Sequence, residues 1–388
     1  MGLSNEFTVD AFKVAGLVPA KKRAVGKETL YTCPFCGKEK LYVNHADKIF
    51  DCKHCGESGG MLKFWAIYRG LEWGSFKEAY KDLLKCAEGS GVIENQRVFD
   101  TKESLKITKA APDAELDRFY REFLSRLTLS KKHKENLSER GMKPETVNAG
   151  LYRTVPGEVK ARQIVLAMKK AGYSFAGIPG FTDEKGYSNM VKIKPGYFVP
   201  VVSEEDHIKA MQIRYDVAKE GETRYKSFSS SYLEGGAEFP KGTMHVSKGN
   251  KKGYVIITEG AMKAEIIRRA FSITAIGLLG VSNTSGIEKV LSKVAEDGAK
   301  IIVAYDMDII VKPQVKSAME RLGDKLIDAG YIPVSLARFD PDVWHHWKKV
   351  FNEDQKIKGL DDYLLYVSKT YGRSRLTNLR VRLFGTDV

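Results

Sequence analysis

The stretch 300-KIIVAYDMDII-310 decides how the chain is interpreted, because it joins a strand-like apolar run to two acidic residues. The run from Ile301 to Ala304 is uninterrupted, which is typical of a strand covered on both faces of a parallel sheet. Asp306 and Asp308 follow directly, and an extended segment would point both carboxylates to the same side. The sequence therefore predicts a buried strand over 300–308 that ends in a pair of acids.

The same alternation of strand and helix extends to both sides of this stretch. Apolar strand patterns cover 254–260, 272–280 and 331–339, and amphipathic helix patterns cover 261–271, 285–298 and 315–330. This alternation predicts an α/β region with a parallel sheet and helices on both faces. Ligand sites on such sheets lie at the carboxyl ends of the strands. Glu259, which ends one strand, is therefore expected at the same edge as Asp306 and Asp308.

Three carboxylates at one edge repel one another and perturb each other's pKa unless a cation joins them. Their hard oxygen ligands suit Mg²⁺, which binds through a few carboxylates and the phosphates of a substrate. Glu259, Asp306 and Asp308 are thus candidate metal ligands for phosphoryl transfer. The alternative is that acids at strand ends simply cap the helices that follow.

A second group of candidate ligands lies in 33-CPFCGKEKLYVNHADKIFDCKHCGESGG-60. Two C-x2-C pairs are separated by fifteen residues, and their members are Cys33, Cys36, Cys52 and Cys55. This spacing is typical of a structural zinc site, and the segment between the pairs alternates apolar and polar residues as a hairpin does. Four cysteines clustered in this way indicate a zinc ribbon in a reducing compartment rather than a disulfide scaffold.

The composition limits the class of protein and suggests a partner. The chain has 388 residues, 43% of them hydrophobic, and this length allows two or three domains. Its net charge of +14 favours a polyanionic partner, most commonly nucleic acid, although a basic solvated protein is the alternative. No apolar run approaches the roughly 20 residues that span a bilayer, and the N-terminus lacks the form of a signal peptide.

The middle of the chain is basic and rich in strand patterns. Basic residues alternate there with aromatic ones, and the candidates for nucleic-acid or nucleotide binding are Arg214, Arg224, Tyr225 and Lys226. The alternative is an ordinary solvated face of a sheet. The predicted organisation is a ribbon domain at 1–88, a linker at 89–112, a basic mixed α+β subdomain at 113–252, a parallel-sheet domain at 253–340 and a C-terminal segment at 341–388.

The acidic pattern resembles a known domain. A strand ending in Glu-Gly, followed by a strand ending in Asp-x-Asp, resembles the TOPRIM domain of bacterial-type primases, topoisomerases and some nucleases. With the ribbon tail CGESGGMLKF, the pair GYFVPVV and MQIR, and the segment RYKSFSSS, the order of motifs over about 30–365 resembles the DnaG-type DNA primases of bacteria and phages. Cys36 stands where many cellular members have His, and Met61 where they often have Asp; an all-cysteine ribbon is also found among phage primases, so these departures bear on the source of the chain more than on its function.

The resemblance implies a DNA-dependent primase that makes short RNA or mixed RNA/DNA primers on single-stranded DNA during phage or mobile-element replication. It implies catalysis by Glu259, Asp306 and Asp308 with Mg²⁺ or Mn²⁺, and a zinc module that helps to select the start site. Template or nucleoside triphosphate contacts are implied for Arg214, Arg224, Tyr225, Lys226 and Lys263. Asp361 and Asp362 match the last acidic motif of the family loosely and are its additional metal candidates; otherwise they are an ordinary helix N-cap.

The remaining expectations concern partners and alternatives. The sequence contains no G-x-x-x-x-G-K-[ST], so we expect a separate replicative helicase, in the cytoplasm of a bacterial host cell. A TOPRIM nuclease and a non-catalytic module that binds single-stranded DNA in replication or defence are the alternatives, and a topoisomerase would need a further large domain. The basic tail 369–388 either binds nucleic acid or a partner, or is a solvated terminus.

Overall fold

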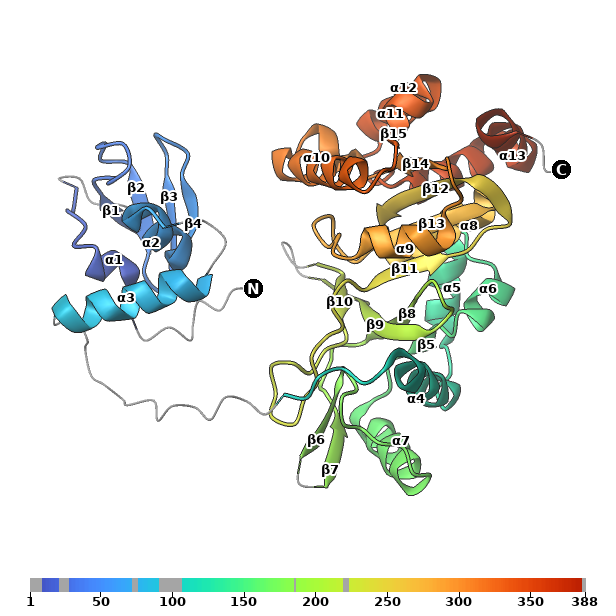
Figure 1. The fold of residues 1–388 in the computed structure, drawn as a ribbon, viewed down its shortest axis with the longest axis horizontal. Helices are drawn as coiled ribbons and strands as arrows, with labels where there is room; N and C mark the ends of the chain where they lie inside the picture. Colours follow the sequence, from blue (N-terminus) through green and yellow to red (C-terminus); the bar gives the residue numbers. More distant parts are fainter. Residues whose placement is uncertain are drawn as a thin grey trace. The chain divides into compact units, whose positions relative to one another are not determined.

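The computed structural model describes residues 9–20, 28–71, 76–90, 107–184, 186–218 and 223–385. It divides into two compact units, Met1–Lys102 and Glu103–Val388 (Figure 1). The linker expected at 89–112 lies largely outside the described residues. No helix in the described part of the chain has the length and apolar character needed to cross a membrane.

The first unit is a small antiparallel sheet with helices beside it. The strands pair in the order β1-β2-β3-β4 and comprise β1 (Thr29–Tyr31), β2 (Leu41–Asn44), β3 (Ile49–Cys52) and β4 (Ser58–Gly60). The helices are α1 (Ala11–Val14), α2 (Met61–Arg69) and α3 (Phe76–Ser90). Alternate residues of β2 and β3 face the core, where Leu41, Val43 and Phe50 pack against Phe64 and Trp65 of α2. This core lies directly beside the buried thiols of the cysteine segment, so the predicted hairpin ribbon is confirmed.

The first half of the second unit is built on an antiparallel sheet of order β10-β9-β8-β5 and a separate hairpin of β6 and β7. Its elements are α4 (Asp113–Ser125), α5 (Lys131–Glu139), α6 (Pro144–Ala149), β5 (Arg153–Thr154), α7 (Glu158–Lys170), β6 (Phe181–Glu184), β7 (Tyr187–Met190), β8 (Gly196–Val202), β9 (Ile208–Tyr215) and β10 (Tyr225–Ser227). Aromatic residues of α4, including Phe119 and Phe123, pack edge-to-face on Phe181 and form the centre of this core. The basic middle region is thus an α+β fold, as predicted.

The second half contains a five-stranded sheet of order β11-β13-β12-β14-β15. Its elements are β11 (Met244–Ser247), β12 (Lys251–Glu259), α8 (Ala261–Phe271), β13 (Ile273–Leu278), α9 (Ile287–Val294), β14 (Lys300–Val303), the 3₁₀ helix η2 (Met307–Ile310), α10 (Pro313–Asp328), β15 (Pro333–Ser335), α11 (Leu336–Phe339), α12 (Pro341–Glu353) and α13 (Leu360–Phe384). Residues of α8, α12 and α13 cover one face of the sheet, and residues of α9 and α10 cover the other. The predicted parallel pairing is confirmed for β13, β12, β14 and β15. The edge strand β11 runs antiparallel to β13, which the sequence reading did not anticipate.

The strand predicted over 300–308 is shorter than expected. β14 ends at Val303, where its ladder with β12 stops, and Asp308 lies in the turn of η2. Asp306 has an extended backbone (φ −59°, ψ 154°) and precedes that turn. The two aspartates therefore do not lie on one extended segment, as the sequence had predicted. Beyond Ala304 the ladder stops, and the next backbone N–H groups find other acceptors: Asp306 donates to Glu259 Oε1, Met307 to the carbonyl of Lys358 and Ile309 to the carbonyl of Asp306.

The basic tail is largely helical, and most of its residues between 369 and 378 are exposed. α13 continues to Phe384, and Leu383 and Phe384 are buried in the core beside α8. Gly372 interrupts the helix with φ 82° and ψ 167°, a conformation that residues with a Cβ rarely adopt. This kink divides α13 into two helical segments that pack in different directions.

Candidate functional site

The four cysteines form a compact cluster in the first unit. All four Sγ atoms lie within 4.8 Å of one another, with 3.9 Å between Cys33 and Cys55 and 3.8 Å between Cys36 and Cys52. A tetrahedral site with Zn–S bonds of about 2.3 Å requires sulfur atoms about 3.8 Å apart, so the donor set fits zinc. Burial alone would raise the pKa of the Cys52 thiol, but backbone N–H groups of Cys55 and His54 outweigh it and lower that pKa to about 7. Burial instead raises the pKa of the Cys33 thiol to about 12, so Cys52 loses its proton more readily than Cys33 does.

Tight turns place these thiols. Gly37 and Gly56 follow the second cysteine of each pair with φ of 70° and 77°, and each donates its backbone N–H to the carbonyl of the first cysteine of its pair. His45 is not a rival ligand, because its Nδ1 lies 2.7 Å from Asp10 Oδ2 and its Nε2 lies 2.9 Å from the Tyr31 hydroxyl.

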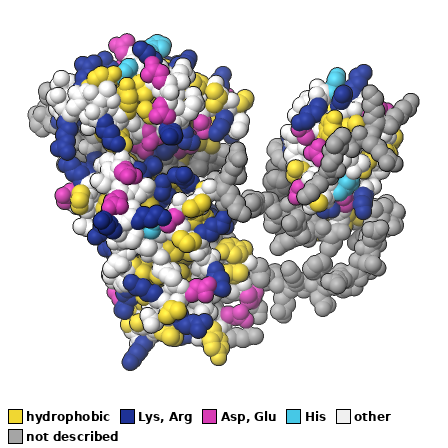
Figure 2. All heavy atoms as spheres, turned by 180° about the vertical axis from the view of Figure 1, so that it is seen from behind, with side chains coloured by type: hydrophobic (Ala, Val, Ile, Leu, Met, Phe, Trp, Pro, Cys, Tyr) yellow, Lys and Arg dark blue, Asp and Glu magenta, His cyan; other side chains and the backbone are white. Residues whose placement is uncertain are grey.

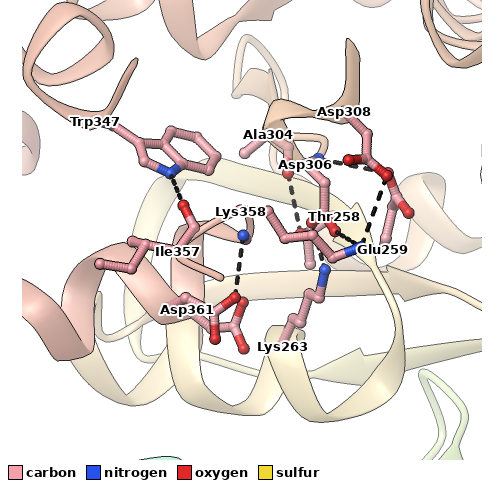
Figure 3. Close-up of polar contacts among 12 residues, drawn as sticks. Thr258, Glu259, Lys263, Ala304, Asp306, Asp308, Trp347, Ile357, Lys358 and Asp361 are labelled. Carbon is pink, nitrogen blue, oxygen red and sulfur yellow. Dashed lines mark hydrogen bonds and ion pairs between the residues drawn. The ribbon is translucent and has the colours of Figure 1, made fainter. Parts of the chain in front are cut away.

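The predicted acids do meet at one edge of the five-stranded sheet, at the ends of β12 and β14. Glu259 is the last residue of β12, and its Oε1 accepts a hydrogen bond of 3.4 Å from the backbone N–H of Asp306. Thr258 Oγ1 donates to the carbonyl of Ala304 at 3.0 Å and holds the end of β14 against β12 (Figure 3). Asp306 is almost fully buried at this edge, whereas Asp308 is partly exposed on the 3₁₀ turn.

Lysine side chains approach this acidic edge from three elements. Lys263, in the first turn of α8, forms an ion pair with Asp306 Oδ1 (Figure 3). Lys312 Nζ lies 2.5 Å from Asp308 Oδ2, and Lys358 Nζ lies 3.8 Å from Asp306 Oδ2 and 3.6 Å from Asp308 Oδ2. Three ammonium groups therefore pair with Asp306 and Asp308, two of the three carboxylates that the sequence predicted as metal ligands.

The protonation of the edge reflects burial and these charges. Burial and the neighbouring carboxylate of Asp306 raise the pKa of Glu259. Burial alone would also raise the pKa of Asp308, but the ammonium groups of Lys312 and Lys358 outweigh it and lower that pKa. Burial would lower the pKa of Lys263, but Asp306 and Asp361 outweigh it and raise that pKa. The ion pairs thus keep Asp308 and Lys263 charged.

The second acidic pair begins α13 beside the same edge. The segment before it is held from two sides, since the Trp347 indole donates to the carbonyl of Ile357 at 3.1 Å and the N–H of Met307 donates to the carbonyl of Lys358 at 2.8 Å. Asp362 caps the helix by accepting the N–H of Gly359 at 3.2 Å, and burial with the neighbouring Asp361 raises its pKa to about 6. Gly359 is thus the N-cap residue of α13, and Asp362 completes the cap from the third helical position.

Asp361 instead faces the interior of the site. It is 2% exposed, its Oδ2 lies 3.5 Å from Arg140 Nη2, and its Oδ1 has no hydrogen-bond partner. A Cβ at Gly359 would stand 2.2 Å from that Oδ1, 3.2 Å from Lys263 Nζ and 3.3 Å from Asp306 Oδ1, so these three atoms converge on one point. Asp361 is accordingly the member of the second pair that joins the acidic edge.

The chemistry of the carboxylates fits a hard divalent cation, but their arrangement is looser than that of the sulfurs. Among the described residues, the four cysteines are the only group of three or more His, Cys, Asp or Glu ligands close enough to be recognised as a metal site. At the acidic edge, a cation would have to replace at least one of the ammonium contacts of Asp306 and Asp308.

The predicted basic residues are divided between a small cavity and a hydrophobic contact. Arg214 and Arg224 line one cavity of about 280 Å³ together with Lys132 and His133. Arg214 is buried over the ring of Tyr197 at 5.6 Å, and its Nε has no hydrogen-bond partner. Glu135, Glu139 and Asp216 line the same cavity, so its lining carries both signs of charge, and Arg214 and Arg224 are its candidate groups for contacting a phosphate.

Tyr225 and Lys226 were both expected on one basic surface, but the structure places them in different environments. The hydroxyl of Tyr225 lies 3.3 Å from Met262 Sδ, and its half-buried ring packs in the core that joins α8 to the antiparallel sheet, whereas Lys226 is exposed. Tyr225 thus braces the first turn of α8, next to Lys263, and is not placed for stacking on a base.

Sequence reasoning missed four residues of this site: Arg140, Lys312, Lys358 and Tyr197. Lys312 follows Asp308 by four residues, and this spacing on a helical turn was a usable signal. Lys358 precedes the acidic pair directly in 358-KGLDDYLL-365, which was a weaker signal. Arg140 and Tyr197 reach the site only through the tertiary fold, and no local pattern marks them.

With this geometry established, the chain can be compared with known proteins. A DNA primase of Thermotoga maritima is 25% identical over 316 residues, which cover 78% of this chain and 51% of that protein. The chain resembles DnaG-type DNA primases. It spans about half the length of the curated relative that it matches. A family model described as a domain of unknown function (DUF3854) matches residues 247–370, which contain the acidic edge.

Solved structures of primase domains align with the chain at low identity. The zinc-binding and RNA polymerase domains of the Aquifex aeolicus primase align with 98% of this chain and 86% of that chain, at 20% identity and a TM-score of 0.46. The RNA polymerase domain of the Mycobacterium tuberculosis primase DnaG, in complex with double-stranded DNA, aligns with 69% of this chain and 80% of that chain, at 13% identity and a TM-score of 0.47.

Proposed function

We propose that this chain is a DNA primase that joins nucleoside triphosphates on a single-stranded DNA template. The observation that carries the proposal is the acidic edge itself, where Glu259 of β12 and Asp306 after β14 converge with Lys263 of α8 and Asp361 of α13. An edge of carboxylates and lysines suits the transfer of a nucleotide, because it offers ligands for cations and charges for phosphates in one place. The resemblance to a DNA primase in the curated relative supports the same reaction.

Glu259, Asp306 and Asp308 are the residues that would hold Mg²⁺ or Mn²⁺ in this proposal, and Asp361 is the additional candidate. The cations would neutralise phosphate charge and orient the attacking and leaving oxygens, in the manner of two-metal nucleotidyl transfer. Glu259 has the raised pKa that suits a group exchanging a proton with the attacking 3′-hydroxyl. Lys263 holds Asp306 in place from the first turn of α8.

The cavity with Arg214 and Arg224 would take the triphosphate or the template backbone. Its guanidinium groups match phosphate oxygens in geometry. Lys226 is exposed and suits the backbone of the template strand, whose phosphates dominate affinity. Tyr225 acts as a brace for α8 and contacts neither substrate.

The organisation and biological setting belong to the same proposal. Residues 1–88 would form the zinc module that helps to select the start site, 113–252 the basic part of the core, 253–340 the TOPRIM domain and 341–388 the segment that completes it. Replication of a phage or mobile element, in the cytoplasm of a bacterial host and with a separate helicase, fits the all-cysteine ribbon.

The test is primer synthesis on a panel of single-stranded templates with labelled ribonucleotides and deoxyribonucleotides and either Mg²⁺ or Mn²⁺. The wild-type chain should produce short labelled oligonucleotides. Asp306→Asn should lower the yield by about a hundredfold or more, because metal-mediated charge stabilisation contributes several kcal/mol. Asp324→Asn, which removes an exposed carboxylate from α10, is the matched control and should leave the yield unchanged.

Other outcomes would contradict the proposal and identify its rivals. Metal-dependent cleavage of DNA without nucleotides, lost in Asp306→Asn, would indicate a nuclease that uses the same edge. Binding of single-stranded DNA without synthesis or cleavage on any template would indicate a non-catalytic module. Equal losses in Asp306→Asn and Asp324→Asn would show that the carboxylate has no specific role.

A further inference from the structure

A cavity of about 540 Å³ lies on the helical side of the second unit, and none of Glu259, Asp306 and Asp308 lines it. Residues 138–144, the middle of α8 and both segments of α13 form its walls. Its volume falls within the range of about 300–1,000 Å³ that is typical of small-molecule sites. Part of its lining is apolar and includes Met142, Ile266 and Leu365, as in a pocket that receives a flat or hydrophobic group.

The charged part of the lining is entirely basic. Five cationic residues contribute to it, namely Arg140, Lys143, Arg269, Arg373 and Arg380, and none of the described residues that line it is Asp or Glu. Lys and Arg side chains are also frequent on the face of this unit that Figure 2 shows. So many positive charges around one cavity repel one another and favour an anion between them.

Two of these guanidinium groups lack part of their hydrogen bonding. Arg140 Nε and Arg269 Nη1 are buried nitrogen atoms without a hydrogen-bond partner. A buried donor without a partner costs free energy, and more so when it is charged, so a ligand that accepts these hydrogen bonds would recover it. Burial lowers the pKa of Arg269, and the nearby carboxylate of Glu265 offsets this only in part.

The basic tail contributes to this cavity through the kink in α13. Gly372 turns the helix, and Arg373 and Arg380 of the second segment then line the cavity across from Arg269. Arg380 is anchored at the edge by its contact of 3.5 Å from Nη1 to the Ser272 hydroxyl. Arg375, one residue from a cavity-lining position on the same segment, lines a different cavity. The second segment of α13 thus contributes basic residues to two separate cavities.

We propose that this cavity is a binding site for a small molecule that carries several phosphates, of the class of nucleoside polyphosphates. Its cations suit a ligand with several negative charges, because Arg pairs with phosphate oxygens in a fixed bidentate geometry. Its apolar lining suits the base or sugar of a nucleotide. Arg140 connects the cavity to the acidic edge, since its Nη2 lies 3.5 Å from Asp361 Oδ2. A phosphate that draws Arg140 toward the cavity weakens its contact with Asp361 and so couples the two sites.

The experiment is isothermal titration calorimetry of the full chain with pyrophosphate and with ATP, in buffer without added divalent cation. The wild-type chain should bind one equivalent of each in the cavity, with affinity that falls as salt rises. The double variant Arg269→Gln/Arg373→Gln should weaken this binding by about tenfold or more, because each lost charge-assisted hydrogen bond contributes at least that factor. Arg375→Gln is the matched control and should bind as the wild type does.

A second set of variants separates this cavity from the proposed nucleotide site at Arg214. Arg214→Gln should leave the pyrophosphate affinity of the cavity unchanged, whatever it does to primer synthesis. If the double variant unfolds, Lys143→Gln at the exposed rim replaces it and should weaken binding by severalfold. The inference is overturned if the wild type binds neither ligand, if Arg375→Gln or Arg214→Gln loses as much affinity as the double variant, or if only single-stranded DNA binds in an Arg269-dependent way.

Discussion

The cysteine cluster and the acidic edge are two candidate metal sites that the chain builds in opposite ways. The cysteines come from a single short stretch, and their sulfur atoms already lie 3.8 and 3.9 Å apart in pairs. The carboxylates come from the ends of β12 and β14 and from the start of α13, segments that are far apart in the sequence. The first site has the spacing that zinc requires, whereas the second has lysine ammonium groups at its carboxylates.

This difference shows what a fold adds to a ligand pattern. A site whose ligands are close in sequence is formed by local turns, so its spacing predicts its geometry. A site assembled by tertiary contacts also gathers counter-charges from other elements, and these decide how strongly a cation must compete. The ribbon should therefore depend on its metal for folding, while the acidic edge should be stable without metal and bind it in competition with lysine.

The largest expected effect is the loss of the first unit when its metal is removed. Cys52→Ser, or treatment with a zinc chelator, should abolish the folding of this unit, because structural zinc contributes about 10–16 kcal/mol in zinc-finger peptides. Calorimetry should then show that one melting transition disappears while that of the second unit remains. The acidic variant Asp306→Asn should do neither, since Lys263 keeps its other carboxylate neighbour Asp361.

The control for this prediction lies in the same unit. Cys86 is outside the cluster, on α3, and Cys86→Ser should retain both zinc and the first transition. A Cys52→Ser chain that still holds one equivalent of zinc, with both transitions intact, would contradict the assignment of a structural four-thiolate site.

A smaller effect is expected in the pH dependence of metal binding at the acidic edge. A cation binds the deprotonated carboxylate of Glu259, and burial beside Asp306 raises its pKa. As pH falls through that raised pKa, protons compete with the metal, so Mn²⁺ affinity should fall by up to about tenfold per pH unit. Electron paramagnetic resonance titration with Mn²⁺ between pH 5 and 8 measures this, and Glu259→Gln should bind more weakly with a flatter profile.

Two variants show which group is responsible. Glu288→Gln is the matched control, because Glu288 lies on α9 and pairs with Lys325 at 3.1 Å, away from the acidic edge, and it should leave the slope unchanged. Asp362, with a pKa of about 6, titrates in the same window. If Asp362→Asn flattens the profile and Glu259→Gln does not, the metal uses the second acidic pair instead of the end of β12.

The sequence predicted those parts of the second unit that depend on local pattern. Parallel strands, the helices on both faces and the position of Glu259 at a strand end follow from apolar periodicity, and the structure confirms the alternation. The antiparallel edge strand β11 is only four residues long, which is too short for a pattern to indicate its direction. The end of β14 was misplaced because the apolar run continues after the ladder with β12 stops at Val303.

The acidic residues of the site could be predicted from the sequence, but their final arrangement could not. Strand-end position is enough to bring Glu259 and Asp306 together, whereas the 3₁₀ turn that redirects Asp308 depends on hydrogen bonds that sequence does not display. Arg140 approaches Asp361 from an element more than two hundred residues earlier. This contact depends on the tertiary packing of α5 on α8, which no local sequence pattern indicates.

The smallest expected effect concerns the competition between lysine and metal. Lys358 lies 3.8 Å from Asp306 and 3.6 Å from Asp308, with 47% of its side chain exposed. Exposed ion pairs contribute about 0.2–1 kcal/mol, so Lys358→Gln should raise Mn²⁺ affinity by no more than about fivefold. Lys356→Gln removes the same charge from an exposed position two residues away and should change the affinity far less.

The direction of this change decides what Lys358 does. A rise in Mn²⁺ affinity would mean that the ammonium group occupies the place of a cation and is released when the metal binds, which leaves it beside the incoming phosphates. In that case Lys358→Gln should also raise the KM for the nucleotide in the synthesis assay, although the metal binds more tightly. A fall in metal affinity would instead mean that Lys358 keeps Asp306 and Asp308 apart and correctly oriented, and the acidic edge would then resemble the cysteine cluster in being formed before its metal arrives.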